Sequence, residues 1–260
     1  QRDISLEPGV FDLLIVDEAS QCDIASVIPL LFRSRRVMVV GDPMQLQHVT
    51  SLSAATDRLL RQQFRVDSDS LQRYSYRSTS MFSLANTSPS AGQRTILRQH
   101  HRCHPSIAEY CSSSFYKGNW IVLTEGRGER GMQWTQVADD SQPAPGGGAV
   151  SKAQMDAIAA ELQRLGSDGY EGTVGVVTPF RRQADLLRDR LHQVLDKSLI
   201  ERWRLLVSTA DGFQGDERDT VLLSLVAGPN LTSGSHGFLA AGPNRFNVAV
   251  SRAKRLLHVF

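Results

Sequence analysis

The sequence is poor in cysteine and has no long apolar segment. Its three cysteines are too few and too scattered for a disulfide framework, which favours a reducing, intracellular compartment. No uninterrupted apolar run approaches the roughly 20 residues that cross a bilayer, and the first residues, QRDISLEPG, lack the apolar centre of a signal peptide. We therefore expect no membrane partner and a cytoplasmic location, with association to the nucleoid if the source is bacterial.

A strong excess of charge of one sign is also missing. Lysine and arginine number 29 against 27 aspartates and glutamates, so the overall balance neither favours nor excludes a polyanionic partner. Residues 181–204 do carry seven basic side chains against four acidic ones. Such a cluster is usually a solvated helix face, so alone it decides nothing about a partner.

Short apolar runs rich in β-branched residues recur along the chain and predict strands. They lie at 11–16, 37–40, 173–177, 204–207, 220–226 and 255–260. Continuous rather than alternating runs suit strands covered on both faces, as in a parallel sheet. Helical spacing appears at 151–165, opened by a Ser151–Gln154 capping box and closed by Gly166, and again at 181–195. This alternation predicts an α/β fold with a mostly parallel sheet.

Two segments interrupt the alternation. Residues 51–95 are polar with weak periodicity, and residues 125–149 hold most of the glycine and proline punctuation, which predicts a long surface loop. A boundary near residue 95 divides the chain into a small first domain, 1–95, with two strands, and a second domain, 96–260, of normal size.

The stretch LLIVDEASQ (13–21) ends an apolar strand in two adjacent carboxylates, Asp17 and Glu18. Asp42 likewise follows the run at 37–40, and open α/β sheets bind ligands at the carboxyl ends of their strands. In hydrolysis of a nucleoside triphosphate, one carboxylate holds Mg²⁺ through water and another orients the attacking water. A lone Asp–Glu pair is more often the polar start of a loop, so this interpretation needs support from the rest of the chain.

That support comes from further motifs in a fixed order. DEASQ is followed by GDPMQL (41–46), LRQHHRCHPSI (97–107), VGVVTPFRRQ (174–183), STADGFQGDERD (208–219) and NRFNVAVSRAK (244–254). Together they resemble the superfamily-1 helicases of the branch of the nonsense-mediated-decay RNA helicase and senataxin, which moves 5′ to 3′. The resemblance runs from about residue 11 to the end. It implies RecA-like lobes of the P-loop NTPase fold, ATP and Mg²⁺ as cofactors, and single-stranded DNA or RNA as partner.

The resemblance also implies roles in the chemistry of the triphosphate. Asp17 matches the carboxylate that binds Mg²⁺ through water, and Glu18 the base that activates water. Gln45 matches the glutamine that senses the γ-phosphate. Arg102 and Arg252 match two arginines that reach the phosphates and stabilise charge developing in the transition state.

The remaining implied roles concern the nucleotide and the strand. His101 stands where the family has a tyrosine that stacks on the base, Glu217 lies near the ribose, and Arg245 is the one arginine left of the family's pair, because Asn244 replaces the other. Both departures put nucleotide affinity in doubt more than the chemical step. Four residues are assigned to the nucleic-acid backbone: Thr178, Arg181, Ser208 and Thr209.

The cluster His100, His101, Cys103 and His104 raises the alternative of a zinc site. Structural zinc needs four ligands at finger-like spacing, and no second cysteine–histidine cluster follows nearby. We interpret the cluster instead as a turn before a helix that begins at Pro105.

The sequence lacks a phosphate-binding loop of the GxxxxGK[ST] type. Gly146–Gly148 before Lys152 has no Gly–Lys pair and follows no predicted strand, and about 30 residues of strand, loop and helix do not fit before residue 11. The simplest interpretation is the C-terminal part of a helicase, whose missing N-terminal part carries the loop. The strand at 37–40 then has an exposed apolar edge, open to self-association.

Two alternatives stay open. A helicase-like module without catalysis would bind nucleic acid or protein. A nuclease or other metal enzyme using Asp17, Glu18 and Asp42 would cleave strands with Mg²⁺ and without ATP.

We predict that these 260 residues alone hydrolyse ATP negligibly, because nothing in the sequence grips the β- and γ-phosphates. A coupled ATPase assay with and without single-stranded DNA or RNA measures this. Fast, polynucleotide-stimulated turnover would refute the interpretation.

Overall fold

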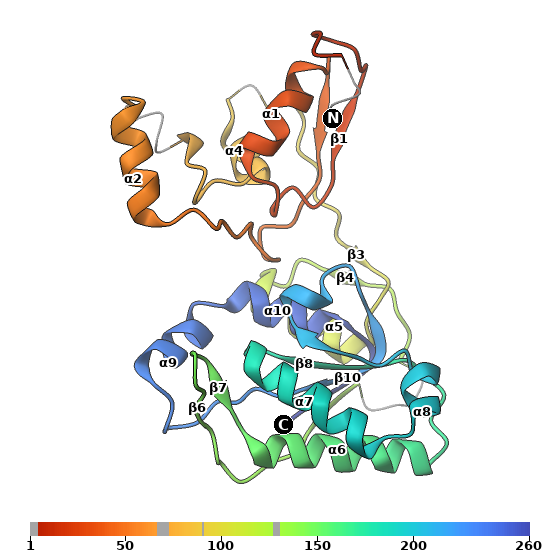
Figure 1. The fold of residues 1–260 in the computed structure, drawn as a ribbon. Helices are drawn as coiled ribbons and strands as arrows, with labels where there is room; N and C mark the ends of the chain where they lie inside the picture. Colours follow the sequence, from red (N-terminus) through yellow and green to blue (C-terminus); the bar gives the residue numbers. More distant parts are fainter. Residues whose placement is uncertain (1–4, 67–72, 90, 127–130) are drawn as a thin grey trace. The chain divides into compact units, whose positions relative to one another are not determined.

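The computed structural model describes residues 5–66, 73–89, 91–126 and 131–260. The chain divides into two compact units, Gln1–Ile96 and Leu97–Phe260 (Figure 1). Within the described ranges, no helix has the length and apolar character needed to span a membrane. The assignment of the two units to a first and a second RecA-like domain stays a prediction.

The first unit is built on a β–α–β crossover. Strands β1 (Leu14–Val16) and β2 (Val37–Val39) pair in parallel, and α1 (Ile24–Phe32) connects them. Asp23 caps α1 by accepting hydrogen bonds from the amide and hydroxyl of Ser26, and the hydroxyl bond is the main reason why the pKa of Asp23 is lowered.

Two helices of the first unit lie where weak periodicity predicted none. They are α2 (Ala54–Gln63) and α4 (Met81–Thr87). Each begins after a serine, Ser53 or Ser80, whose hydroxyl accepts the amide N–H of the residue three positions on. The cap signal was present in the sequence, but serine is so frequent in this segment that it did not stand out.

The core of the first unit is small. Val16, Ala19, Val27 and Met81 are its buried members, so α1 and α4 both pack against the strand pair. The strand pair itself remains apolar and open: Leu13, Ile15, Val37 and Met38 are each exposed by 45–58%. An exposed apolar strand is a site for pairing with another chain, and self-association through it stays a prediction.

The second unit contains a five-stranded, fully parallel sheet. Its order is β5 (Met132–Trp134), β11 (Ala253–Val259), β10 (Arg218–Leu223), β8 (Val174–Thr178) and β9 (Leu206–Thr209). The predicted α/β class with a mostly parallel sheet is therefore confirmed. The prediction of one long loop over 125–149 was wrong, because this segment contains β5 and the short hairpin of β6 (Gln142–Pro143) and β7 (Ala149–Val150).

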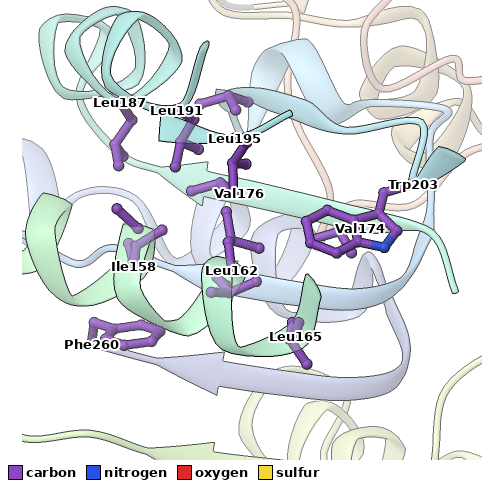
Figure 2. Packing of buried hydrophobic residues seen from close by; sticks show 13 residues of the cluster. Ile158, Leu162, Leu165, Val174, Val176, Leu187, Leu191, Leu195, Trp203 and Phe260 are labelled. Atoms are coloured by element: carbon purple, nitrogen blue, oxygen red, sulfur yellow. The ribbon is translucent and has the colours of Figure 1, made fainter. Parts of the chain in front are cut away.

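Both faces of this sheet are covered. Helices α6 (Lys152–Ser167) and α7 (Arg181–Val194) pack over one face, where Leu162 and Leu187 meet Val176 of the sheet (Figure 2). Val221 and Leu223 point to the other face, because side chains alternate along a strand, and they too are buried. On that side α10 (Pro243–Ser251) packs against β10, β11 and helix α5 (Pro105–Phe115).

The predicted ends of α6 are only half right. Ser151 accepts the N–H of Gln154, as a capping box requires, but the Gln154 carboxamide turns away and accepts hydrogen bonds from Ser224 and Val226. The helix also continues through Gly166. Its stop comes just later, at Gly169, whose φ of +70° allows the chain to reverse.

Candidate functional site

The DEASQ and GDPMQL motifs are tied together beyond the ends of their strands. Val40 donates its N–H to the carbonyl of Val16 at 2.8 Å, and Ala19 donates its own to the carbonyl of Val40 at 2.9 Å. The buried hydroxyl of Ser20 donates to the carbonyl of Asp42 at 2.8 Å. Hydrogen bonds therefore join the two polar loops that follow β1 and β2.

Asp17 and Glu18 are exposed at this end of β1, whereas Ala19 and Ser20 are buried and anchor the loop. Glu18 has a left-handed backbone, with φ of +49°, and donates its N–H to the carboxylate of Asp17 at 2.8 Å. For a residue other than glycine this conformation costs about 1–3 kcal/mol. The turn keeps both residues at the strand end, where the side-chain amide of Gln21 donates to the carboxylate of Glu18 at 3.2 Å.

Asp42 organises its own loop. Its carboxylate accepts the N–H of Met44 at 2.8 Å and the side-chain amide of Gln45 at 3.1 Å, so the position of Gln45 depends on it. Gly41 is required just before it, because a Cβ there would lie 2.7 Å from the ring of Phe82 on α4. These bonds favour a structural role for Asp42, which weakens the alternative of a three-carboxylate metal enzyme.

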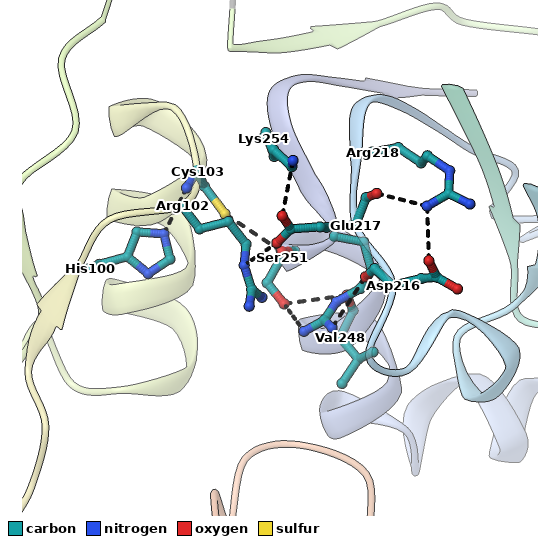
Figure 3. Close-up of polar contacts among 10 residues, drawn as sticks. His100, Arg102, Cys103, Asp216, Glu217, Arg218, Val248, Ser251 and Lys254 are labelled. Atoms are coloured by element: carbon teal, nitrogen blue, oxygen red, sulfur yellow. Dashed lines mark hydrogen bonds and ion pairs between the residues drawn. The ribbon is translucent and has the colours of Figure 1, made fainter. Parts of the chain in front are cut away.

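In the second unit, Glu217 lies between two basic side chains (Figure 3). Arg102 pairs with one carboxylate oxygen at 2.8 Å and Lys254 with the other at 2.9 Å. The hydrogen bond from Lys254, reinforced by the charges of Arg102 and Arg252, outweighs partial burial and lowers the pKa of Glu217. Lys254 was not among the predicted site residues, although it is the last residue of the NRFNVAVSRAK motif.

Arg252 reaches the same neighbourhood from the end of α10 and is almost fully buried. Its guanidinium donates to the carbonyl of Val248 at 3.2 Å, to the hydroxyl of Ser251 at 3.3 Å and to the carbonyl of Asp216 at 3.5 Å. A buried cation needs such partners, because an uncompensated one is costly. Arg102 and Arg252, which are 150 positions apart in the sequence, thus both lie close enough to Glu217 to lower its pKa.

The four side chains of the suspected zinc cluster have separate environments. His100 is the last residue of β3 (Gln99–His100); its ring accepts the N–H of Cys103 and stacks on Trp120 at a centroid distance of 4.4 Å. Burial raises the pKa of the Cys103 thiol to about 11. His104 caps α5, and His101 is exposed. In the described part of the chain, no three histidine, cysteine or acidic side chains gather in a metal-binding group.

A groove of about 1020 Å³ lies at the carboxyl ends of β8 and β9, within the second unit. Its walls come from the β6–β7 hairpin, the first turns of α7, the segment after β9 and the start of α9 (Ser233–Ala240). Three of the four residues predicted to contact nucleic acid line this groove: Arg181, Ser208 and Thr209.

Thr178 does not line the groove. It is the last residue of β8, a strand with all five residues buried, and its side chain has no exposed surface. Two residues that the sequence analysis did not single out, Arg182 and Arg188, do line it. The position of Arg188 could have been predicted from the sequence, because it lies seven positions after Arg181 and therefore on the same helix face.

Arg245 does not line the groove but contacts a residue of its wall. Its guanidinium carbon is 3.9 Å from the ring centre of Phe238, which lines the groove beside Phe180 at a centroid distance of 5.6 Å. This arrangement is a cation–π contact. The motif alone did not indicate this contact.

The chain belongs to the AAA-domain family whose model matches residues 77–260, well over half of its length; a second model, also described as an AAA domain, matches residues 3–52. Helicase SEN1 of Saccharomyces cerevisiae is 28% identical over 285 residues, which cover 99% of this chain and 11% of SEN1. The probable helicase senataxin of Homo sapiens is 27% identical over 266 residues, which cover 96% and 9%. The resemblance to senataxin-like superfamily-1 helicases is therefore confirmed.

The helicase of PRRSV, a solved structure, is 15% identical with a TM-score of 0.46, over 95% of this chain and 34% of that chain. The chain spans only about a tenth of the length of the two curated relatives.

Replacing Glu217 by Gln should destabilise the second unit at neutral pH by less than about 1 kcal/mol, because the carboxylate is partly exposed and its ion pairs are screened. Because the pKa of Glu217 is lowered in the folded state, its carboxylate stabilises the folded chain fully above the ordinary pKa of 4.5. This stabilisation is lost as the pH falls through the lowered pKa. The difference from the natural chain should therefore shrink below pH 4.5. Urea unfolding followed by tryptophan fluorescence measures it, because Trp120, Trp134 and Trp203 all lie in the second unit.

Lys254→Met is the matching partner variant and should show the same trend, since it removes the main cause of the lowered pKa. A destabilisation that stays equal from pH 7 to pH 3 would contradict this account of Glu217.

Proposed function

We propose that the chain is part of an ATP-dependent helicase or translocase, which couples hydrolysis of ATP to movement on single-stranded DNA or RNA. The observation that carries the proposal is the gathering of Arg102 and Arg252 around Glu217. Guanidinium groups that converge from distant segments suit the polyanionic triphosphate better than a role in folding alone. Membership of the senataxin-like branch supports the same reaction.

In the first unit, Glu18 would orient and deprotonate the attacking water, and Gln45, held by Asp42, would sense the γ-phosphate. Asp17 would hold Mg²⁺ through water, and its exposed oxygen ligands fit a hard cation that keeps most of its waters and binds few carboxylates. When bound with the nucleotide, Mg²⁺ neutralises charge on the β- and γ-phosphates.

Arg102 and Arg252 would stabilise the charge that develops on the transferred phosphoryl group. Related arginines are worth roughly 10³–10⁵ in rate. The backbone and hydroxyl bonds of Arg252 support this role, because a guanidinium already oriented needs little reorganisation during the reaction. His101 would stack on the base and Glu217 would contact the ribose.

The groove of the second unit would bind the backbone of the strand. Arg181 and Arg182 would supply positive charge, whereas Arg188 already pairs with Asp185 at 3.0 Å. Ser208 and Thr209 would supply hydroxyl groups, and the start of α7 would supply backbone N–H groups. Such contacts hold phosphates without reading sequence, so they suit a protein that moves along a strand. Because Arg245 stacks on Phe238, a residue of the groove wall, a role near the strand suits it better than a contact with the nucleotide.

An intracellular location belongs to the same proposal. Cys22, Cys103 and Cys111 are free thiols, which suits a reducing compartment.

In the full-length protein, Glu18→Gln should lower strand-stimulated ATP hydrolysis by about 10²-fold or more, because a carboxamide cannot accept a proton from water. ATP and strand should still bind. A coupled ATPase assay and a filter-binding assay measure the two properties.

Glu7→Gln is the control, since Glu7 is an exposed carboxylate of the same unit outside the motifs. If the natural protein binds strand but hydrolyses no ATP, the chain is the non-catalytic module instead.

Arg181→Ala should weaken binding of single strands of any sequence, because it removes one phosphate contact. The slope of log affinity against log salt concentration should become shallower by about one. Fluorescence anisotropy with labelled oligonucleotides at several salt concentrations measures the slope.

Arg190→Ala is the matched control on the same helix, where Arg190 pairs with Asp156 and does not line the groove. Equal losses in the two variants would show that the groove is not the strand site.

A further inference from the structure

Three walls of the groove meet at one buried side chain, Gln183, in the first turn of α7. It has no exposed surface. Its carbonyl oxygen accepts the N–H of Ser151 at 3.1 Å, and its amide donates to the carbonyl of Ser151 and to the hydroxyl of Ser224, each at 3.1 Å. Gln183 therefore binds two segments that are far from it, and from each other, in the sequence.

Each partner of Gln183 leads into a different wall. Ser151 directly follows β7, whose hairpin contributes Gly147 and Gly148 to the groove. Ser224 directly follows β10, and the chain beyond it forms the start of α9. The third wall is α7 itself, where Arg181 stands two positions before Gln183.

A second carboxamide strengthens the same junction. Gln154 accepts the hydroxyl of Ser224 at 2.7 Å and the N–H of Val226 at 3.1 Å. Val226 is buried with φ of +49°, a conformation that β-branched residues rarely adopt. It is held there by this bond and by packing in a cluster with Ala149 and Phe180. Hydrogen bonds and apolar contacts thus join the hairpin, α7 and the segment after β10 at one place.

We propose that Gln183 is a positioning residue that sets the spacing of the groove walls, and through it the grip on the strand backbone. Gln183 does not line the groove, so it acts only through the residues it holds. Without its carboxamide, the backbone groups of Ser151 would be buried and lack its two hydrogen bonds, and relief requires the hairpin and α7 to separate. Phosphate contacts made from both walls at once would then be lost. This inference rests on the proposed strand-binding function.

The test compares Gln183→Met with Thr220→Val in the full-length protein. Methionine has similar length but makes no comparable hydrogen bonds. Thr220 is also buried, in the sheet that α7 covers, and Thr220→Val loses a hydrogen bond to Tyr170 away from the groove. Strand affinity is measured by anisotropy with labelled oligo(dT) and oligo(U) at several salt concentrations, and stability by urea unfolding.

Gln183→Met should weaken strand binding about tenfold and make the salt dependence shallower by about one. Thr220→Val should bind strand like the natural protein, whatever stability it loses. A smaller folded fraction lowers the amount of protein that can bind but removes no phosphate contact from the folded molecules, so the slope separates positioning from folding.

Unchanged affinity in folded Gln183→Met, or equal changes of slope in both variants, would overturn the inference. If Gln183→Met does not fold, Ser224→Ala serves instead, since it removes one donor and one acceptor of the same junction. Ser224→Ala should weaken strand binding about threefold, and unchanged binding would count against the inference. If the natural protein binds no strand at all, the proposed function falls and the inference with it.

Discussion

A parallel sheet covered on both faces can present polar groups to a ligand only at its strand ends, and this constraint organises the second unit. All five residues of β8 are buried, and the side chain of Thr178 among them has no exposed surface. Chemistry is confined to the segments that follow the strands: the start of α7 after β8, and Ser208 and Thr209 at the end of β9. The groove lies at this edge because the covered faces leave no other place for it.

The charged groups around Glu217 differ in how deeply they are buried. The ion pairs of Glu217 with Arg102 and Lys254 are partly exposed and contribute little to stability. Arg252 is buried and depends on carbonyl and hydroxyl oxygens. The first arrangement leaves side chains free to exchange one partner for another, whereas the second fixes a cation in place. Both properties suit the phosphate-binding role proposed for these arginines.

The buried polar junction around Gln183 shows a different use of hydrogen bonds. Apolar packing joins α6 and α7 to the sheet over a wide area (Figure 2), but such packing is not directional. Carboxamides have fixed donors and acceptors, so Gln183 and Gln154 specify how the hairpin, α7 and the segment after β10 are arranged. Satisfied buried networks of this kind favour one arrangement of a structure over its alternatives.

The outline of the fold was readable from local patterns. Each predicted apolar run contains or overlaps a strand, and both predicted helices exist, because period and burial follow directly from residue order. Elements whose stability comes from partners far along the chain were missed. The apolar content of β5 is too low to reveal a strand, and it forms because β11 supplies an adjacent edge. Gly166 did not end α6, and packing accounts for a glycine there instead, because a Cβ would lie 2.9 Å from a side-chain methyl of Leu199 in the neighbouring α8 (Lys197–Arg202).

The candidate site likewise has features that the sequence determines and features that only the folded structure determines. The sequence by itself determined the family, the order of the motifs and the kinds of side chain available, because these depend only on residue identity and spacing. Only the tertiary structure decided that Arg245 stacks on Phe238, that Thr178 is withdrawn into the sheet, that Lys254 shares Glu217 with Arg102, and that Gln183 joins three walls of a groove. Each of these facts depends on how side chains pack in the folded chain, and the direction of a side chain toward its partner is set by that packing rather than by its neighbours in the sequence.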